Sequence, residues 1–268
     1  MTTVRRSPRW LLAAPLVVLT VVFGAGLLRA RMEAPAPVVP AGSPTPTPVL
    51  TEPKTAVVAE PQPRTDLVRL AGRVPAHGSG RFEYASGRGK ILGAKGPVRR
   101  FQVAVERGAG EDVTAFAAHV EAVLGNPRSW IGNGRARLQR VGPADAHHFR
   151  ILLATRETAG QLCAKGGIDI RNGAHPYTSC RTSGKVIINL DRWRLSAAPY
   201  IQWKVPLAVY RQYVINHEVG HELGEGHQGC PKRGAAAPVM MQQTLSLRGC
   251  VPYAWPRRGN RPLSGPRL

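Results

Sequence analysis

The stretch HEVGHELGEGH (His217–His227) sets three histidines at fixed offsets. Residues four apart lie on one face of a helix, so His217 and His221 can direct ring nitrogens at a single ion. Gly224 comes three residues after His221, and glycine accepts the left-handed conformation that ends a helix. The chain can then turn back and bring His227 to the same point. The spacing therefore predicts a zinc site made by His217, His221 and His227.

Glu218, next to the first of these histidines, predicts the chemistry of the site. Three neutral imidazoles leave zinc its full charge and an open fourth position for water, whose pKa then falls toward neutrality. In the pattern H-E-x-x-H the glutamate can reach that water without being a ligand itself. We expect Glu218 to take the proton of the zinc-bound water as it attacks a carbonyl, and to pass it to the leaving amine. A histidine-rich helix end without chemistry would explain the histidines, but not the offsets of the glutamate and the glycine.

The sequence around this stretch predicts an α+β fold. The zinc-site helix is expected to start near Pro206, a good first-turn residue. Residues 98–106 alternate like a half-buried strand, and residues 113–124 repeat at helical spacing and stop at Gly125. Two further strands are expected in ARLQRV and FRILLA, and a buried one in GKVIINL (residues 184–190).

HEVGHELGEGH resembles the signature of the metzincin clan of zinc metallopeptidases. The resemblance implies a twisted mixed sheet with a backing helix and a zinc-site helix. It also implies a methionine in a tight turn beneath the zinc, a role that Met240 or Met241 in APVMMQQT could fill. Two methionines that only fill core space are the structural alternative. Some clan members also use a tyrosine beyond this turn, which makes Tyr253 a candidate.

A closer resemblance is to a domain of unknown function in secreted and membrane-anchored actinobacterial proteins. It rests on VIINLDRW, YRQYVINHEVGHELGEGH, CP, APVMMQQT and GCVPYAWP, and covers most of the region from Arg81 to Pro256. It implies a metzincin-like fold and carries no substrate. The residues after the third histidine, Gln228 to Cys230, depart from the established peptidase subfamilies.

The four cysteines allow three pairings. Pairing of nearest neighbours, Cys163 with Cys180 and Cys230 with Cys250, is the simplest and is our expectation. The second bridge would connect the zinc loop to the methionine turn and stabilise the fold by roughly 3 kcal/mol. The alternative is four free buried thiols in a cytosolic protein, which the N-terminal sequence argues against.

The N-terminal residues 1–31 predict a signal anchor, with an uncharged membrane-spanning run at about residues 10–28. Cleavage of this segment and release of the protein is the alternative. Residues 32–65 are rich in proline and predict an extended stalk without a packed core. The zinc domain would then occupy residues 66–268, outside the cytoplasm and attached to the cell membrane, where disulfides persist.

The net charge of +21 comes from 37 basic against 16 acidic residues. The basic residues are scattered and no nucleic-acid motif accompanies them, so we expect no nucleic-acid partner. The expected partners are the membrane, through the N-terminal helix, and a protein or peptide substrate. A cell-wall peptide is one form that this substrate could take.

Three functions remain compatible with these residues. The first is a membrane-anchored zinc endopeptidase, favoured because Glu218 and all three histidines are present. The second is a catalytically silent zinc module that binds a partner at the cell surface. The third is a zinc amidase that acts on cell-wall peptides with the same residues.

Overall fold

The computed structural model describes residues 67–268. The expected membrane anchor (residues 1–31) and proline-rich stalk (residues 32–65) lie outside the described residues. No helix within residues 67–268 has both the length and the apolar character that crossing a bilayer requires.

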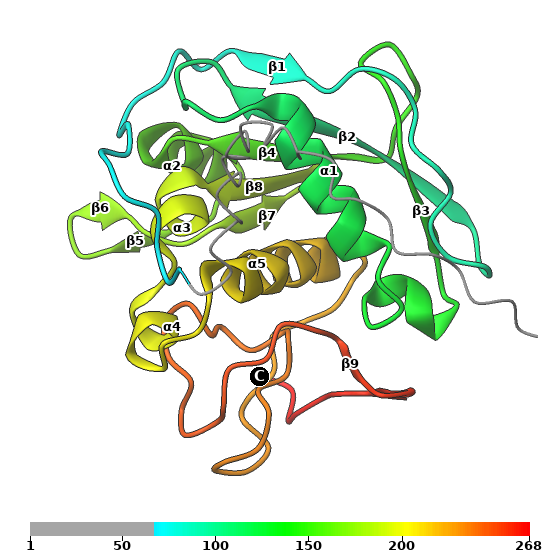
Figure 1. Ribbon diagram of the computed structural model, residues 1–268, viewed down its shortest axis with the longest axis vertical. Coiled ribbons are helices and arrows are strands. Elements are labelled where there is room, and N and C mark those ends of the chain that lie inside the picture. The colour runs from blue at the N-terminus through cyan, green and yellow to red at the C-terminus, as the bar shows by residue number, and fades with distance from the viewer. Residues whose placement is uncertain (1–66) are drawn as a thin grey trace, which may run out of the picture. The chain divides into compact units, whose positions relative to one another are not determined.

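The described part of the chain is an α+β structure built on a mixed six-stranded sheet of order β1-β2-β4-β8-β7, with β3 also paired to β2 (Figure 1). β2, β3, β4 and β8 run parallel, whereas β1 and β7 pair antiparallel at the two edges. The sheet strands are β1 (Phe82–Tyr84), β2 (Val98–Glu106), β3 (Arg137–Arg140), β4 (Phe149–Ala154), β7 (Cys180–Thr182) and β8 (Lys185–Asn189). The two remaining strand pairs are β5 (Arg171–Asn172) with β6 (His175–Pro176), and β9 (Arg257–Arg258) with β10 (Arg261–Pro262).

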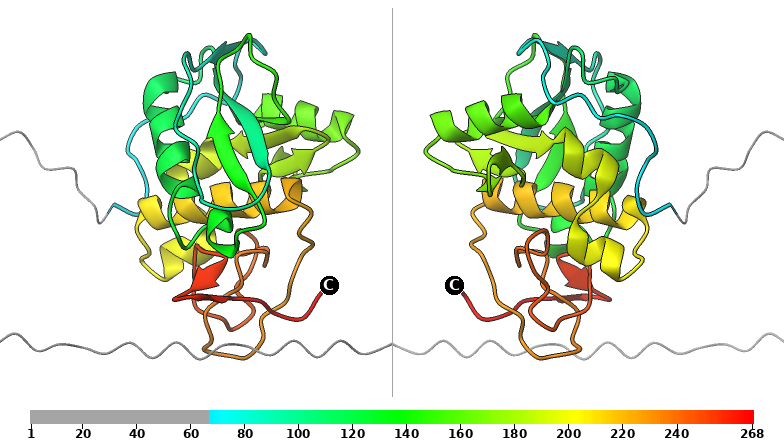
Figure 2. Two further views of the ribbon diagram at one scale, coloured as in Figure 1. Left: turned by 90° about the vertical axis from the view of Figure 1, so that its right-hand side faces the viewer. Right: turned by 90° about the vertical axis from the view of Figure 1, so that its left-hand side faces the viewer.

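Helices cover both faces of the sheet. The helices are α1 (Val113–Leu124), the 3-10 helix η1 (Trp130–Asn133), α2 (Arg156–Lys165), α3 (Leu190–Leu195), α4 (Ala198–Gln202) and α5 (Leu207–Glu222). Ile151 of β4 and Ile188 of β8 are buried in the main core together with α1 and α5. Ile187, whose side chain points to the other face, belongs to a second cluster with α2. The sheet lies on one side of α5 and the loops of residues 224–268 lie on the other (Figure 1, Figure 2).

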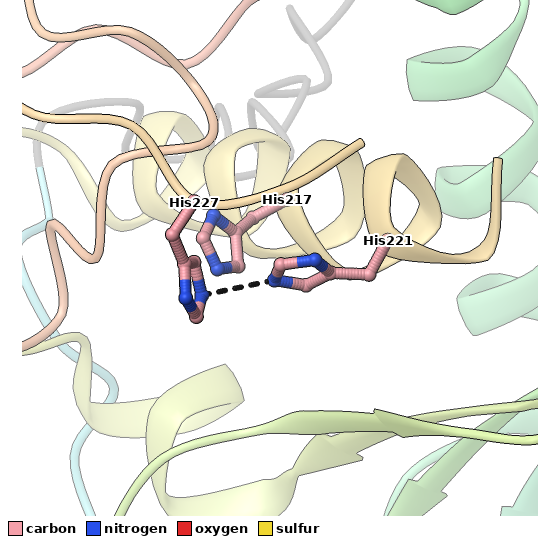
Figure 3. Close-up of side chains that lie close together, drawn as sticks. All are labelled: His217, His221 and His227. Carbon is pink, nitrogen blue, oxygen red and sulfur yellow. Dashed lines mark hydrogen bonds between the residues drawn. The ribbon is translucent and has the colours of Figure 1, made fainter. Parts of the chain in front are cut away.

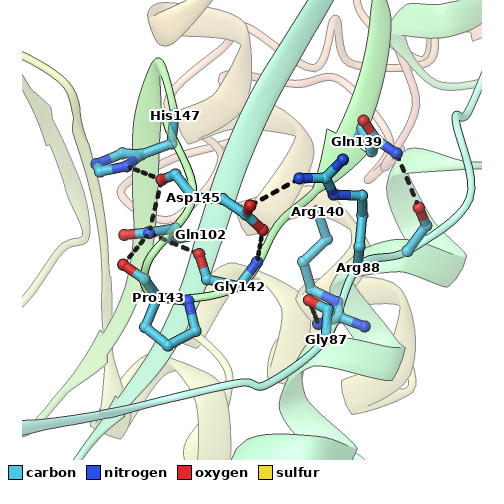
Figure 4. A network of polar contacts seen from close by, with 10 residues as sticks. Gly87, Arg88, Gln102, Gln139, Arg140, Gly142, Pro143, Asp145 and His147 are labelled. Atoms are coloured by element: carbon cyan, nitrogen blue, oxygen red, sulfur yellow. Dashed lines mark hydrogen bonds and ion pairs between the residues drawn. The ribbon is translucent and has the colours of Figure 1, made fainter.

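The strand expected over residues 98–106 has those bounds as β2, but its burial was predicted wrongly. From Phe101 to Glu106 every side chain is buried, so the strand is not half-exposed. The polar side chain of Gln102 explains how the second face is covered, because its Nε2 donates to the carbonyls of Gly142 and Pro143, both at 2.9 Å (Figure 4). A buried amide with partners is compatible with a core, and an alternating pattern alone cannot show that a loop covers the polar face.

His119, in the middle of α1, gives the fold a testable dependence on pH. Its ring packs edge-on against Trp193, with 5.1 Å between the ring centroids. Burial, and next the charge of Arg211, lower the pKa of His119 from 6.5 to about 4. The unfolded chain therefore binds a proton more readily than the folded chain, and stability must fall as the pH drops from 6.5 toward 4. We expect His119 to account for about 2 kcal/mol of this loss.

The measurement is urea unfolding of the zinc-free protein at pH 7.5 and pH 4.5. The His119→Leu variant should lose about 2 kcal/mol less on acidification than the native protein. His77→Leu changes an exposed histidine and should behave like the native protein. Equal losses in all three proteins would contradict the assignment.

Candidate metal centre

Two histidines of α5 have ring orientations set by backbone carbonyls. The Nδ1 atom of His217 donates to the carbonyl of Val239 at 2.8 Å, and the Nδ1 atom of His221 donates to the carbonyl of Glu225 at 2.9 Å. A carbonyl can only accept, so each Nδ1 carries the proton and each Nε2 keeps its lone pair. Such outer hydrogen bonds orient histidines that bind metal ions.

The end of α5 brings the third histidine back. α5 ends at Glu222, and Gly224 follows with φ of +93°, in the left-handed region that favours glycine. The chain reverses there and places the Nε2 atom of His227 3.0 Å from the Nε2 atom of His221 (Figure 3). The ligand atoms of His217, His221 and His227 all lie within 4.8 Å of one another. Within residues 67–268 this is the one cluster of three or more such side chains.

The three histidines fit a zinc ion. Tetrahedral ligands at about 2.0–2.1 Å from zinc are about 3.3 Å apart, close to the 3.0 Å between the Nε2 atoms of His221 and His227. Burial lowers the pKa of His217 to about 3 and lowers the pKa of His221 and of His227. All three rings are therefore neutral near pH 7, which is the protonation state that binds metal.

Glu218 is a buried carboxylate beside this cluster. Its residue is 5% exposed, and burial raises the pKa of its carboxyl to about 8. It faces a cavity of about 310 Å³ that the three histidines also line. A buried acid of this kind, next to a metal cluster in a cavity, is a candidate proton carrier.

The cavity lies between α5 and the edge strand β7. Its other lining residues come from the segment that ends in β7 and from the loop after the methionine pair. They are Ile168, Asp169, Ile170, Thr178, Ser179, Cys180, Arg181, Gln242, Thr244 and Leu245, and α5 adds Tyr213. Tyr253 does not line it, because the Tyr253 hydroxyl donates to the carbonyl of Arg257 at 2.8 Å. Tyr253, a candidate from the resemblance alone, is therefore not among the residues that line the cavity.

The two methionines lie in different environments. The chain turns at Pro238, whose carbonyl accepts from the amide of Met241 at 3.0 Å. Met240 belongs to the main core and packs under α5, where a Cβ atom added at Gly220 would lie 2.4 Å from its Sδ atom. Met241 instead packs beside Cys250 in a separate cluster. Met240 is thus the methionine that packs against α5, and Gly220 permits its close approach.

The buried amide of Gln243, not anticipated from the sequence, holds the methionine turn. Its Nε2 donates to the carbonyls of Pro238 at 3.0 Å and Tyr253 at 2.8 Å. Its Oε1 accepts from the Tyr200 hydroxyl at 2.8 Å and from the Tyr253 amide at 3.2 Å. The side chain is fully buried and uses all four of its bonding positions. A lone glutamine in a loop gives no sequence signal of this role.

A second buried amide, Asn216, anchors α5 one residue before His217. Its Oδ1 accepts from the Ser129 hydroxyl at 2.7 Å, and its Nδ2 donates to the carbonyl of Ala254 at 3.0 Å. These bonds join α5 to two loops far from it in sequence. They limit how the helix can rotate, and so help to fix where His217 points.

The expected disulfide pairing is confirmed. Cys163 is bonded to Cys180, and Cys230 to Cys250. The first bridge connects α2, a helix that the sequence did not suggest, to β7 at the edge of the cavity. The second connects the loop just past His227 to the segment after the methionine turn.

The C-terminal segment pairs with the loop that carries the third histidine. The amide of Leu268 donates to the carbonyl of His227 at 3.1 Å, and the amide of Gly229 donates to the carbonyl of Pro266 at 2.7 Å. The amide of Gly265 donates to Oε1 of Gln228 at 3.0 Å. The last residues therefore form a strap along one side of the His227 loop.

Comparison with known proteins gives one match. A family model described as a protein of unknown function (DUF3152) matches residues 69–253. No curated protein and no solved structure matches the chain.

Proposed function

Since the chain belongs to the DUF3152 family of proteins of unknown function, its activity has to be inferred from the site, and we propose that it is a zinc-dependent endopeptidase. One observation carries the proposal: three neutral imidazoles converge on a point beside the buried carboxylate of Glu218, in a cavity open to a ligand. Structural zinc sites have closed coordination by four protein ligands, whereas three ligands leave a position for chemistry.

The histidines and Glu218 would have different roles in catalysis. His217, His221 and His227 would hold Zn²⁺, which supplies Lewis acidity toward a carbonyl and lowers the pKa of water. Glu218, which is not among the three, would accept a proton from the attacking water and deliver it to the leaving nitrogen. Its position in the same cavity as the three histidines places it beside the water that would be activated.

A metzincin-like arrangement belongs to the same proposal. It is supported by the mixed sheet with α5 beneath it, by the chain reversal at Gly224, and by Met240 packed against Gly220 under the ligands. Met241, which packs elsewhere, would not take part.

We also propose that the domain works outside the cytoplasm, tethered to the cell membrane by residues 10–28. Its support is the sequence of that segment together with the two disulfides, which persist in oxidising compartments. Cleavage and secretion would leave the domain in the same compartment. The partner in either case is a protein or peptide, with a cell-wall peptide as one form.

The experiment uses the full-length chain in detergent. Elemental analysis should find one zinc per chain, and an unfolded test protein should be cleaved. A chelator should abolish cleavage and added zinc should restore it. His221→Ala should lose both the zinc and the cleavage, whereas His77→Ala, at an exposed histidine, should lose neither.

The outcomes separate the alternatives. Stoichiometric zinc without cleavage of the unfolded protein or of peptidoglycan peptides would indicate a binding module. Cleavage of peptidoglycan peptides alone would indicate a cell-wall amidase. A native protein that binds no zinc would end the proposal.

A further inference from the structure

Among the residues that line the cavity, Arg181 is the one with a positively charged side chain. Besides the histidines, its charged lining residues are Asp169, Arg181 and Glu218. Asp169 is occupied by Arg171, whose Nη2 lies 2.8 Å from its Oδ2 and whose hydrogen bonds lower the pKa of Asp169 to about 2. Glu218 is acidic, so Arg181 is the cationic group that a negatively charged ligand could meet in the cavity.

Arg181 is held in place from beneath by α5. Its Nε donates to Oε2 of Glu222 at 2.7 Å, and the Glu222 side chain is only 5% exposed. The same carboxylate lies 3.9 Å from Nη2 of Arg99. One buried carboxylate thus faces two guanidinium groups, and this group of three has an excess of one positive charge.

Arg181 lines the cavity, and the end of its side chain is free to bind. Within residues 67–268, its Nη1 and Nη2 atoms make no hydrogen bond, while its side chain is 36% exposed. The Nη atoms of an arginine form a planar fork that matches the two oxygens of a carboxylate. Because Glu222 already fixes the side chain, little further ordering is needed when a carboxylate binds.

Arg181 lies at one end of the cavity. Its partner Glu222 follows His221 directly on α5, whereas Tyr213 lies nine residues earlier, about 13 Å along the helix. The uncharged lining residue Thr244 lies toward the Tyr213 end, because its hydroxyl is hydrogen-bonded to the Tyr210 hydroxyl at 2.9 Å. The positive charge is therefore confined to the end next to His221.

We propose that Arg181 is a specificity residue that binds a carboxylate of the substrate, so that the protein prefers acidic peptides. This inference rests on the proposed function for its meaning in catalysis. The carboxylate can belong to an aspartate or glutamate side chain, or to the C-terminus of the substrate peptide.

The test compares two pools of random-sequence peptides, one containing Asp and Glu and the other containing Asn and Gln in their place. Each pool is made with a free C-terminal carboxylate and with a C-terminal amide. For the native full-length chain we expect kcat/KM to be roughly 10- to 100-fold higher on the pools with the recognised carboxylate. Arg181→Gln should remove this preference, because its loss of kcat/KM on the pools with the recognised carboxylate should exceed its loss on the neutral amidated pool by about 10-fold or more.

Three further variants control for the loss of charge and for folding. Arg99→Gln also removes one positive charge next to Glu222, but Arg99 lines a different cavity. This variant should keep the preference. Arg181→Gln combined with Glu222→Gln leaves no buried carboxylate without a partner, so it tests the same point if Arg181→Gln does not fold. Arg181→Lys should restore part of the preference.

A binding measurement separates this inference from the proposed function. Fluorescence anisotropy measures how tightly labelled peptides bind to the Glu218→Gln variant, and it requires no hydrolysis. If the native protein cleaves nothing, tighter binding of the acidic pool that disappears in Arg181→Gln still supports the role of Arg181. Equal binding and equal kcat/KM for all four pools would overturn it.

Discussion

Replacement of Glu218 by glutamine is expected to lower peptide hydrolysis by about 1000-fold while zinc binding persists. Glutamine has the shape of glutamate but cannot accept the proton of the attacking water. The ligand cluster consists of His217, His221 and His227 without Glu218, so the affinity for zinc should change little. The measurement is kcat on a cleaved peptide together with the zinc dissociation constant from competition with a chelator.

Stability distinguishes this effect from damage to the fold. Glu218 is buried, and burial raises its pKa, so its charge opposes folding. Glu218→Gln should therefore unfold at the same urea concentration as the native protein or at a higher one. Glu121→Gln removes a carboxylate from α1, where it pairs with Arg140 at 2.8 Å, and should retain full activity. A Glu218→Gln protein that cleaves at the native rate would remove Glu218 from the mechanism.

The second large effect is expected at Gln243, where leucine should cost about 4 kcal/mol of unfolding free energy. Leucine fills a similar volume but leaves the carbonyls of Pro238 and Tyr253, the Tyr253 amide and the Tyr200 hydroxyl without their partner. Each buried polar group that loses its hydrogen bond costs about 1–3 kcal/mol. Urea unfolding of the zinc-free protein measures the loss.

The same change should weaken zinc binding, because the methionine turn also supplies the Val239 carbonyl that orients His217. We expect a 10- to 100-fold rise in the zinc dissociation constant. Gln161→Leu makes the same substitution at an exposed position of α2 and should change neither quantity by much. A loss of less than about 1 kcal/mol for Gln243→Leu would show that water replaces the amide.

Local patterns were enough to predict a good part of this structure. α1 covers residues 113–124 and stops at Gly125 as expected, and α5 starts directly after Pro206. These elements follow from side-chain periodicity and from capping residues within a few positions. The cluster of three histidines could be predicted from local patterns as well, because one turn of helix and a glycine turn bring the histidines together.

The supports of the site could not be predicted in this way. Gln243 and Asn216 bond to residues far away in sequence, and neither residue type at its position signals a partner. Gly220 reads as an ordinary small residue within the motif, and its need for small size appears only when Met240 packs against it. α2 escaped prediction because few of its residues are apolar and only Ala159 and Cys163 are buried. Tertiary contacts, not local preference, decide such features.

The strap formed by the last residues matters to anyone who prepares this protein. The family match ends at residue 253, and a shortened chain ending there would contain every histidine, Met240 and Met241, and all four cysteines. It would nevertheless lack the amide of Leu268 and the carbonyl of Pro266 that bond to the His227 loop. A loop released on that side can hold its ligand less firmly, so such a fragment would understate the affinity for zinc. Purification tags therefore belong on the N-terminal side of the domain, where they leave the strap in place.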